Sequence, residues 1–311
     1  MEEIVAGIDI GGTNTTIGLV SNTGRVLTKI SIKTTQFPKI EDFVETAARL
    51  ISEQLESLKK DLPEISLKGV GIGAPNANPY KGTIENAPNL SWQGVVPLAE
   101  LFSNKLNVQC KITNDAKAAA LGELFFGAAR GMRDFIVITL GTGLGSGIVA
   151  NGALIYGHDG FAGELGHVIM VPDGRLCGCG RHGCLETYVS ATGLVRTYRE
   201  LNHKDAEIPS ARTIAERAVS GEAEAIETFR LTGEMLGFAL ANSVAYTSPE
   251  AIFLFGGLIR AGELLFKPTR EAFEKNLLNN YKGHIHIYPS ALHEGDAAVL
   301  GAASILWNSQ N

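Results

Sequence analysis

Apolar residues recur along this chain with two periods. Short apolar runs bounded by glycine or polar turns predict buried strands, and apolar steps of three and four predict amphipathic helices. The clearest helical pattern covers residues 40–59, where the apolar positions share one face. The predicted strands are 4–10, 15–20, 25–30, 68–72, 108–113, 134–140, 146–150, 251–255 and 284–288, and the other predicted helices are 116–126, 191–199, 213–219, 223–245, 264–280 and 297–307.

One pattern occurs twice. A strand, a glycine loop and a second strand open the chain near residue 4, and the same sequence of features returns near residue 135. This repetition predicts two related α/β halves with a hinge near Asn114. We expect a smaller N-terminal α/β domain formed by residues 1–114 plus 297–311, and a larger C-terminal α/β domain formed by residues 115–296.

Composition narrows the class of protein. Of the 311 residues, 45% are apolar and 19% charged, which is typical of a globular protein. The net charge of −6 and the absence of a basic stripe argue against a nucleic-acid partner. The acidic N-terminus does not resemble a signal peptide, and six glycines interrupt the uncharged run 135–157, so we expect no membrane segment and a cytoplasmic location.

Two glycine loops are the first candidates for chemistry. Residues 9–14 read Asp-Ile-Gly-Gly-Thr-Asn, and residues 140–147 read Leu-Gly-Thr-Gly-Leu-Gly-Ser-Gly. Neither fits the Walker or dinucleotide pattern, because each turns one strand back into another. Tight hairpins are the plain alternative, but paired loops with hydroxyl donors favour phosphate binding. The candidate nucleotide-binding residues are Asp9, Gly11, Gly12, Thr13, Asn14, Gly141, Thr142 and Gly143, with Gly256 and Gly257 as a weaker candidate for contact with adenosine.

Three of the four cysteines are crowded into one loop, as Cys177, Cys179 and Cys184. Three thiolates with one imidazole form a usual tetrahedral zinc site, and a closed set of four protein ligands predicts a structural ion. The residues alone leave His167 and His182 as alternatives for the fourth ligand. A loop of reduced cysteines or a redox pair is the other interpretation, although Cys-x-Cys is not the usual redox spacing.

Together these motifs resemble the ROK family of repressors, open reading frames and sugar kinases. The resemblance is carried, in order, by the two glycine loops, Asn114-Asp115-Ala116, Glu164-Leu165-Gly166-His167 and the cysteine motif 177–186. It implies an α/β protein with the actin-like, hexokinase-like (ribonuclease H-like) fold, in which two α/β domains surround a cleft. It also implies an ATP-dependent hexose kinase similar to the bacterial glucokinases, with His167 as the fourth zinc ligand.

The resemblance further implies residue roles. Asp115 is expected to be the general base for the sugar's 6-hydroxyl, with a pKa lowered by its helix start; a simple helix cap is the alternative. Mg²⁺ is expected to bridge the phosphate oxygens, with Asp9 as the nearest carboxylate, directly or through water. The resemblance places Asn114, Asp115, Glu164, His167 and Glu186 around the hexose, and Asn89 and Asn76 are further candidates.

Two other classes of function share some of these motifs. A sugar-responsive repressor would need a DNA-binding helix-turn-helix before the first loop, where only eight residues precede Asp9. A zinc-containing sugar-binding module without catalysis is a third class. N-acetylmannosamine, mannose, allose and fructose are alternative substrates. Family members are often homodimers, and helix 223–245 is a candidate interface.

Overall fold

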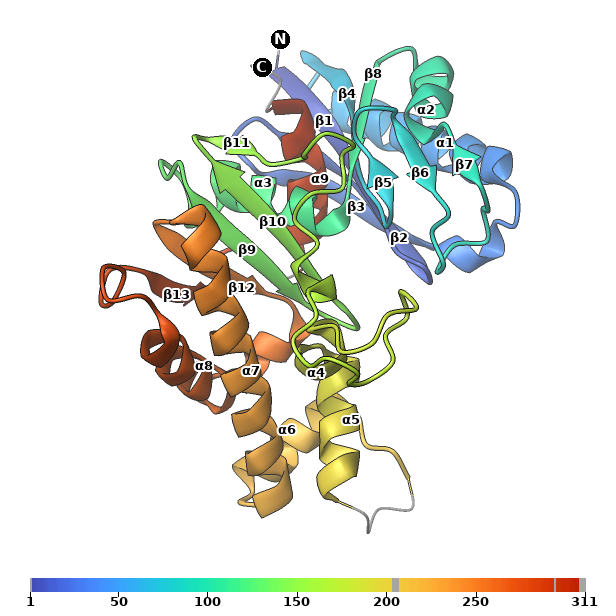
Figure 1. The fold of residues 1–311 in the computed structure, drawn as a ribbon. Helices are drawn as coiled ribbons and strands as arrows, with labels where there is room; N and C mark the ends of the chain where they lie inside the picture. The colour runs from blue at the N-terminus through green and yellow to red at the C-terminus, as the bar shows by residue number, and fades with distance from the viewer. Residues whose placement is uncertain (1, 203–206, 294, 308–311) are drawn as a thin grey trace. The chain divides into compact units, whose positions relative to one another are not determined.

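The computed structural model describes residues 2–202, 207–293 and 295–307. The chain forms two compact units, which are interleaved in sequence. The first unit contains Met1–Gly131, Leu154–Ala162 and Ala291–Asn311, and the second contains Met132–Ala153 and Gly163–Ser290. Figure 1 labels the elements of both units. Among the described residues, no helix is long and apolar enough to cross a membrane.

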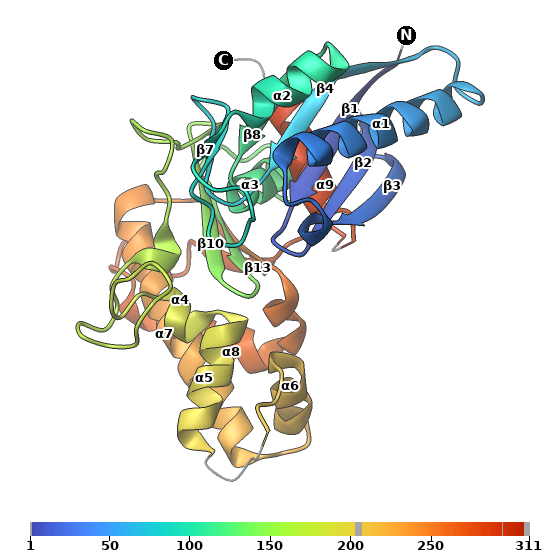
Figure 2. The same ribbon diagram turned by 90° about the vertical axis from the view of Figure 1, so that its right-hand side faces the viewer.

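A five-stranded sheet forms the centre of the first unit. Its central strand, β1, is antiparallel to β2 and parallel to β4. Helices α1 (Ile40–Lys59) and α2 (Leu98–Leu106) pack on one face of the sheet, and α9 (Ala297–Trp307) packs on the other together with α3 (Asp115–Phe126) (Figure 2). The strands, in sheet order, are β3 (Val26–Lys33), β2 (Asn14–Ser21), β1 (Glu2–Ile10), β4 (Ile65–Gly73) and β8 (Gln109–Thr113).

Helix α9 approaches the sheet of the first unit unusually closely. A Cβ atom on Gly7 would lie 2.2 Å from the Val299 carbonyl oxygen, and one on Gly71 would lie 1.9 Å from the Ala302 carbonyl oxygen. Only glycine fits between strand and helix backbone at such distances. These glycines therefore serve packing, away from the glycine loop at the end of β1.

The second unit repeats the strand arrangement of the first. Its central strand β9 is antiparallel to β10 and parallel to β12, which confirms the predicted pair of related halves. The strands, in sheet order, are β11 (Ala153–Leu154), β10 (Leu144–Ala150), β9 (Phe135–Leu140), β12 (Ala251–Phe255) and β13 (His286–Pro289). The longer helices are α5 (Ala191–Leu201), α6 (Ala211–Val219), α7 (Ala223–Thr247) and α8 (Glu263–Asn276).

Some short elements are absent from the sequence-based prediction. They include helix α2 and the four-residue helix α4 (Glu186–Val189). They also include a small three-stranded sheet in the first unit, formed by β5 (Ala77–Asn78), β6 (Thr83–Glu85) and β7 (Val95–Val96). Such short segments carry too few residues to show a clear period.

The compact units divide the chain differently from the expected domains. The expected boundary lay at residue 114, but helix α3 belongs to the first unit because it packs against α9 and β4. Residues 154–162 and 291–296 also belong to the first unit. Of the expected N-terminal domain, residues 1 and 308–311 lie outside the described residues.

Candidate active site

The first glycine loop follows β1 and is shaped by a close approach to Asn89. The Gly11 N–H donates to the Asn14 carbonyl at 3.0 Å, which closes the turn. A Cβ atom on Gly12 would lie 2.8 Å from the Asn89 carbonyl oxygen and 2.9 Å from the Asn89 Cβ atom. Thr13, Asn14 and Asn89 are exposed. The loop thus presents free donors to solvent, directly beside a predicted sugar-binding residue.

Replacing Gly12 by alanine is expected to damage this part of the site. The added methyl group must push the loop away from Asn89, so we expect KM for the nucleotide and for the sugar to rise about tenfold, with a loss of about 1–3 kcal/mol in the free energy of unfolding. Steady-state kinetics and urea unfolding measure both effects. Gly257→Ala is the stability control, because its Cβ atom would meet nothing within 4 Å; equal destabilisation of the two variants would contradict the steric argument.

Two carboxylates of the first unit meet near the end of β4. A Cβ atom on Gly73 would lie 3.8 Å from Asp9 Oδ1 and 3.7 Å from the Asp115 Cα atom. Burial raises the pKa of Asp9 to about 7, and the nearby charge of Asp115 adds to the rise. This acidic pair beside Gly73 is suited to receive positive charge.

Asp9 should therefore make stability depend on pH. Its pKa of about 7 lies above the ordinary value of 3.8, so the folded chain binds more protons between these pH values and the free energy of unfolding falls as pH rises through this window. We expect Asp9→Asn to stabilise the metal-free protein by up to about 4 kcal/mol at pH 8, with little difference at pH 4. Urea unfolding in EDTA at both pH values measures this; a constant difference between wild type and variant would contradict it.

Helix α3 begins with the predicted cap and the predicted base. The side chain of Asn114 accepts hydrogen bonds from the backbone N–H groups of Ala116, at 2.9 Å, and Lys117. Asp115 Oδ1 also accepts from the Ala116 N–H, at 2.8 Å. Asn114 therefore caps the helix, and the Asp115 carboxylate lies at the same helix start with its residue exposed to solvent.

The expected low pKa of Asp115 is wrong in direction. Loss of solvation by the surrounding protein raises the pKa of this carboxyl group. The Ala116 N–H and the positive charge of Lys117 act to lower it, but they are the smaller effects. A raised pKa makes Asp115 a stronger base than the helix start alone would give.

The second glycine loop, in the second unit, is bonded to Glu186. The Leu144 N–H donates to Glu186 Oε2 at 2.9 Å, and a Cβ atom on Gly143 would lie 2.3 Å from the same oxygen. Glu186 is the first residue of α4, while Gly141 and Thr142 are exposed. The predicted phosphate loop and a predicted sugar-binding carboxylate thus form one hydrogen-bonded group.

The Glu164–His167 motif is fixed to β10 through its backbone. A Cβ atom on Gly166 would lie 2.2 Å from the Leu144 carbonyl oxygen. The Ser146 hydroxyl donates to the Gly163 carbonyl and accepts the Leu165 N–H at 3.2 Å. Ser146 was not among the predicted site residues, because a buried serine on a strand gives no signal in the sequence. Glu164 itself is exposed.

His167 joins the three clustered cysteines. Its Nδ1 lies 3.7 Å from Cys177 Sγ, and Cys179 Sγ lies 3.6 Å from Cys184 Sγ. The four candidate ligand atoms all lie within 4.8 Å of one another. Tetrahedral ligands about 2.3 Å from a zinc ion would be about 3.7 Å apart, so this donor set fits zinc. His182 instead places its Nδ1 3.0 Å from the Gly174 carbonyl oxygen.

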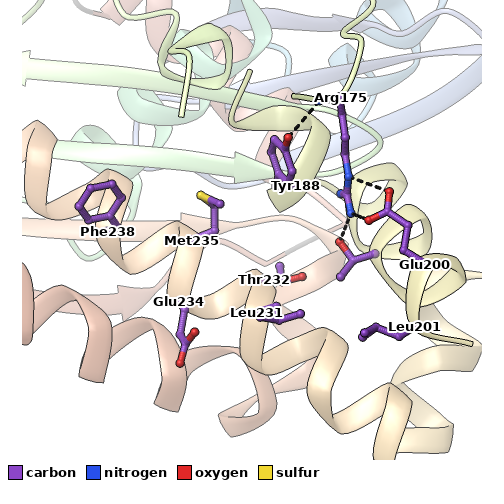
Figure 3. A pocket seen from close by; sticks show the side chains of 10 residues that line it. Arg175, Tyr188, Glu200, Leu201, Leu231, Thr232, Glu234, Met235 and Phe238 are labelled. Carbon is purple, nitrogen blue, oxygen red and sulfur yellow. Dashed lines mark hydrogen bonds and ion pairs between the residues drawn. The ribbon is translucent and has the colours of Figure 1, made fainter. Parts of the chain in front are cut away.

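A buried arginine also holds the cysteine loop. Arg175 donates to the Thr187 carbonyl at 2.8 Å, forms an ion pair with Glu200, and lies 4.5 Å from the centre of the Tyr188 ring. Figure 3 shows this group on one side of a cavity of about 390 Å³ in the second unit. The cavity is lined by none of the predicted site residues. Arg175 therefore connects the cysteine loop to α4 and α5 without a metal.

The third glycine element lies at the end of β12. Gly256 has a φ of 109°, and a Cβ atom there would lie 2.5 Å from the Leu140 carbonyl oxygen. Gly257 is exposed and open on the side where a Cβ atom would point. The element leaves bare backbone near the start of the second glycine loop, as contact with a flat ring would require.

The structure brings the predicted residues together in two groups, one in each unit. The first unit holds the first glycine loop with Asp9, Asn89, Asn114 and Asp115. The second unit holds the second glycine loop, Gly256 and Gly257, Glu164, His167, Glu186 and the cysteines. Asn76, the less secure candidate, uses its side-chain amide to donate to the Glu85 and Asn86 carbonyls, both at 3.2 Å.

Known proteins resemble the chain over nearly its whole length. The profile of the ROK family matches residues 5–309. The chain is 36% identical to the glucokinase of Thermotoga maritima, over 96% of each chain. It is also 30% identical to the xylose repressor of Caldicellulosiruptor bescii, over 97% of this chain but 77% of that protein.

Solved structures agree with these sequence relatives. A ROK family glucokinase from Streptomyces griseus, solved in complex with glucose and AMPPNP, is 32% identical with a TM-score of 0.78, over 97% of this chain and 98% of that one. The expected actin-like, hexokinase-like α/β fold is thereby confirmed.

Proposed function

Because this chain belongs to the ROK family, we propose that it transfers the γ-phosphoryl group of ATP to the 6-hydroxyl of glucose. The observation that carries the proposal is the 36% identity to a glucokinase over 96% of both chains. The similar structure from Streptomyces griseus contains glucose and an ATP analogue, which supports the same pair of substrates here.

Asp115 is assigned as the general base. The residue is exposed although protein surrounds its carboxylate, so a substrate hydroxyl can reach the side chain, and its backbone is fixed at the start of α3 by the Asn114 cap. When Asp115 accepts the proton of the 6-hydroxyl, that oxygen becomes a stronger nucleophile for attack on the γ-phosphorus. Since phosphoryl transfer depends mainly on positioning and on neutralising charge, the base has a supporting part in it.

The nucleotide is assigned to the exposed and half-buried residues of the glycine loops. Gly12, Thr13 and Asn14 in the first unit and Gly141–Gly143 in the second are assigned to the phosphates, and Gly256 and Gly257 to the adenosine. The acidic pair of Asp9 and Asp115 fits a divalent cation, and we assign Asp9 to hold hydrated Mg²⁺. Mg²⁺ would neutralise phosphate charge during transfer.

The remaining sugar-binding residues are Asn89, Asn114, Glu164, His167 and Glu186. A hexose offers hydroxyl groups that both donate and accept, and these amide, imidazole and carboxylate side chains supply the matching partners. His167, Cys177, Cys179 and Cys184 fit a structural zinc ion. That ion would hold the loop which leads into Glu186, and through it the Leu144 N–H of the second glycine loop.

The test of the function is ADP release with Mg-ATP. A panel of glucose, mannose, fructose, N-acetylglucosamine and N-acetylmannosamine is assayed with the wild-type protein. The highest kcat/KM on glucose is expected. A preference for another hexose would keep the chemistry and change the substrate, because discrimination by one hydroxyl or acetyl group depends on the shape of the pocket. No turnover on any sugar would reject the kinase assignment.

A sugar-responsive repressor is the second candidate. The 30% identity to a xylose repressor favours it, because the matched part of that protein resembles the whole of this chain. Binding of sugar with a micromolar Kd by calorimetry, together with no ADP release from Mg-ATP, would support a sugar-binding protein without kinase activity, which this candidate requires.

A further inference from the structure

One short segment of the first unit interrupts the sequence of the second unit. Residues Leu154–Ala162, here named the strap, belong to the first unit, although the chain on both sides belongs to the second. The strap folds back on itself, because the Ala162 N–H donates to the Tyr156 carbonyl at 2.9 Å and Gly157 and Gly160 have φ angles of 72° and 92°. It ends two residues before Glu164, so it delivers the chain to a proposed sugar-binding carboxylate.

Three side chains fasten the strap by its backbone carbonyl groups. The Tyr80 hydroxyl donates to the Gly157 carbonyl at 2.7 Å, and Asn78 Nδ2 donates to the Asp159 carbonyl at 3.1 Å. Lys117 Nζ donates to the Gly160 carbonyl at 3.1 Å. All three donors lie in the first unit, and the contacts follow one another along the strap.

Lys117 differs from the other two donors by its positive charge, although Asn78 is equally buried. Lys117 is 1% exposed, and lysine is almost never so deeply buried without a specific partner for its charge. It stands in the first turn of α3, two residues after Asp115. Burial raises the pKa of Asp115, and the positive charge of Lys117 partly opposes that rise. The buried ammonium group of Lys117 thus holds the strap and also acts electrostatically on the proposed base at the start of α3.

We propose that Lys117 is a positioning residue for the phosphoryl transfer, because its bond to the Gly160 carbonyl fastens the strap to the helix that begins with Asp115. Its kinetic consequence rests on the proposed hexokinase function. The strap leads into Gly163 and Glu164, and Ser146 holds Gly163 and Leu165 from the other side. Losing the bond therefore leaves the Glu164 backbone supported only from the side of Ser146, which weakens sugar binding. The nucleotide-binding glycine loops lie elsewhere in the chain, so ATP binding is unaffected.

The test compares Lys117→Met with Lys117→Arg and Tyr80→Phe. Methionine keeps the apolar stem and removes the charged donor, so we expect KM for glucose to rise about tenfold while KM for ATP changes by less than about twofold. Hydrogen exchange of peptides covering 154–164 should accelerate in the same variant. Lys117→Arg should restore both KM for glucose and the slow hydrogen exchange of the strap. Tyr80→Phe removes an uncharged donor from an exposed residue, so it should raise KM for glucose by less than Lys117→Met does.

Two results would overturn the proposal. The first is unchanged strap exchange and unchanged KM for glucose in Lys117→Met. The second is an equal rise of both KM values in the methionine and arginine variants, which indicates a general loss of structure. If Lys117→Met does not fold, Lys117→Gln replaces it and is judged by the same two criteria. Inactivity of the wild type on every sugar would reject the proposed function, whereas hydrogen exchange would still decide whether Lys117 holds the strap.

Discussion

Replacing Asp115 by asparagine is expected to lower kcat on glucose by about 10²–10⁴-fold, because an amide cannot accept the proton of the 6-hydroxyl. The helix should remain, since Asn114 provides the cap and asparagine has nearly the same size as aspartate. Steady-state ADP release measures the loss. Circular dichroism and calorimetric titration with glucose show that the variant is folded and still binds sugar.

A matched control separates catalysis from a helix-end effect. Asp42 is an acidic residue in the first turn of α1, where it carries no proposed chemistry. Asp42→Asn should leave kcat within about twofold of the wild type, because charge at a helix start contributes only tenths of a kcal/mol to about 1 kcal/mol. Activity of Asp115→Asn above a tenth of the wild-type value would reject Asp115 as the base.

Replacing Cys184 by alanine is expected to abolish zinc binding and most of the activity. Cys184 is fully buried, and its thiol is one of the four ligand atoms in the cluster with His167. Without the ion the loop before Glu186 loses its cross-link, so we expect the thermal midpoint to fall by about 10 °C or more. Metal analysis by mass spectrometry, a thermal scan and the ADP assay measure the three effects.

Cys110 supplies the control for this variant. It is also a free cysteine, packs against the core of the first unit and lies outside the cluster. Cys110→Ala should keep one zinc per chain and lose at most about 1–2 kcal/mol of stability through the missing sulfur atom. Metal-free wild-type protein with full activity and an unchanged thermal midpoint would refute the structural role of zinc.

Local pattern predicted much of the fold. Helix α1 is found at residues 40–59, as expected, because its apolar stripe is long and unbroken. The repeated strand, loop and strand predicted two related halves, but not the strand order that the two sheets share. The residues of each glycine loop were also identified, since glycine in a hairpin after a buried strand is visible in the sequence.

Long-range packing explains what the sequence did not predict. Helix α3 belongs to the first unit through its contacts with α9, more than 170 residues away in sequence. The raised pKa of Asp115 depends on how much protein surrounds it, whereas the sequence showed only its helix start. The choice of His167 over His182 came from the family resemblance, because the spacing allows either, and the structure groups His167 with the three cysteines.

The position of α9 has a consequence for synthesis of the protein. This helix packs against β1, β2, β4 and β8, yet it is synthesised after the whole second unit, which lies between these strands and α9 in the sequence. The sheet of the first unit must therefore keep its glycine-rich face uncovered until residues 297–307 have left the ribosome. Nascent chains arrested before residue 297 should leave this sheet accessible to chaperones, and deletion of residues 297–307 should destabilise the first unit more than the second.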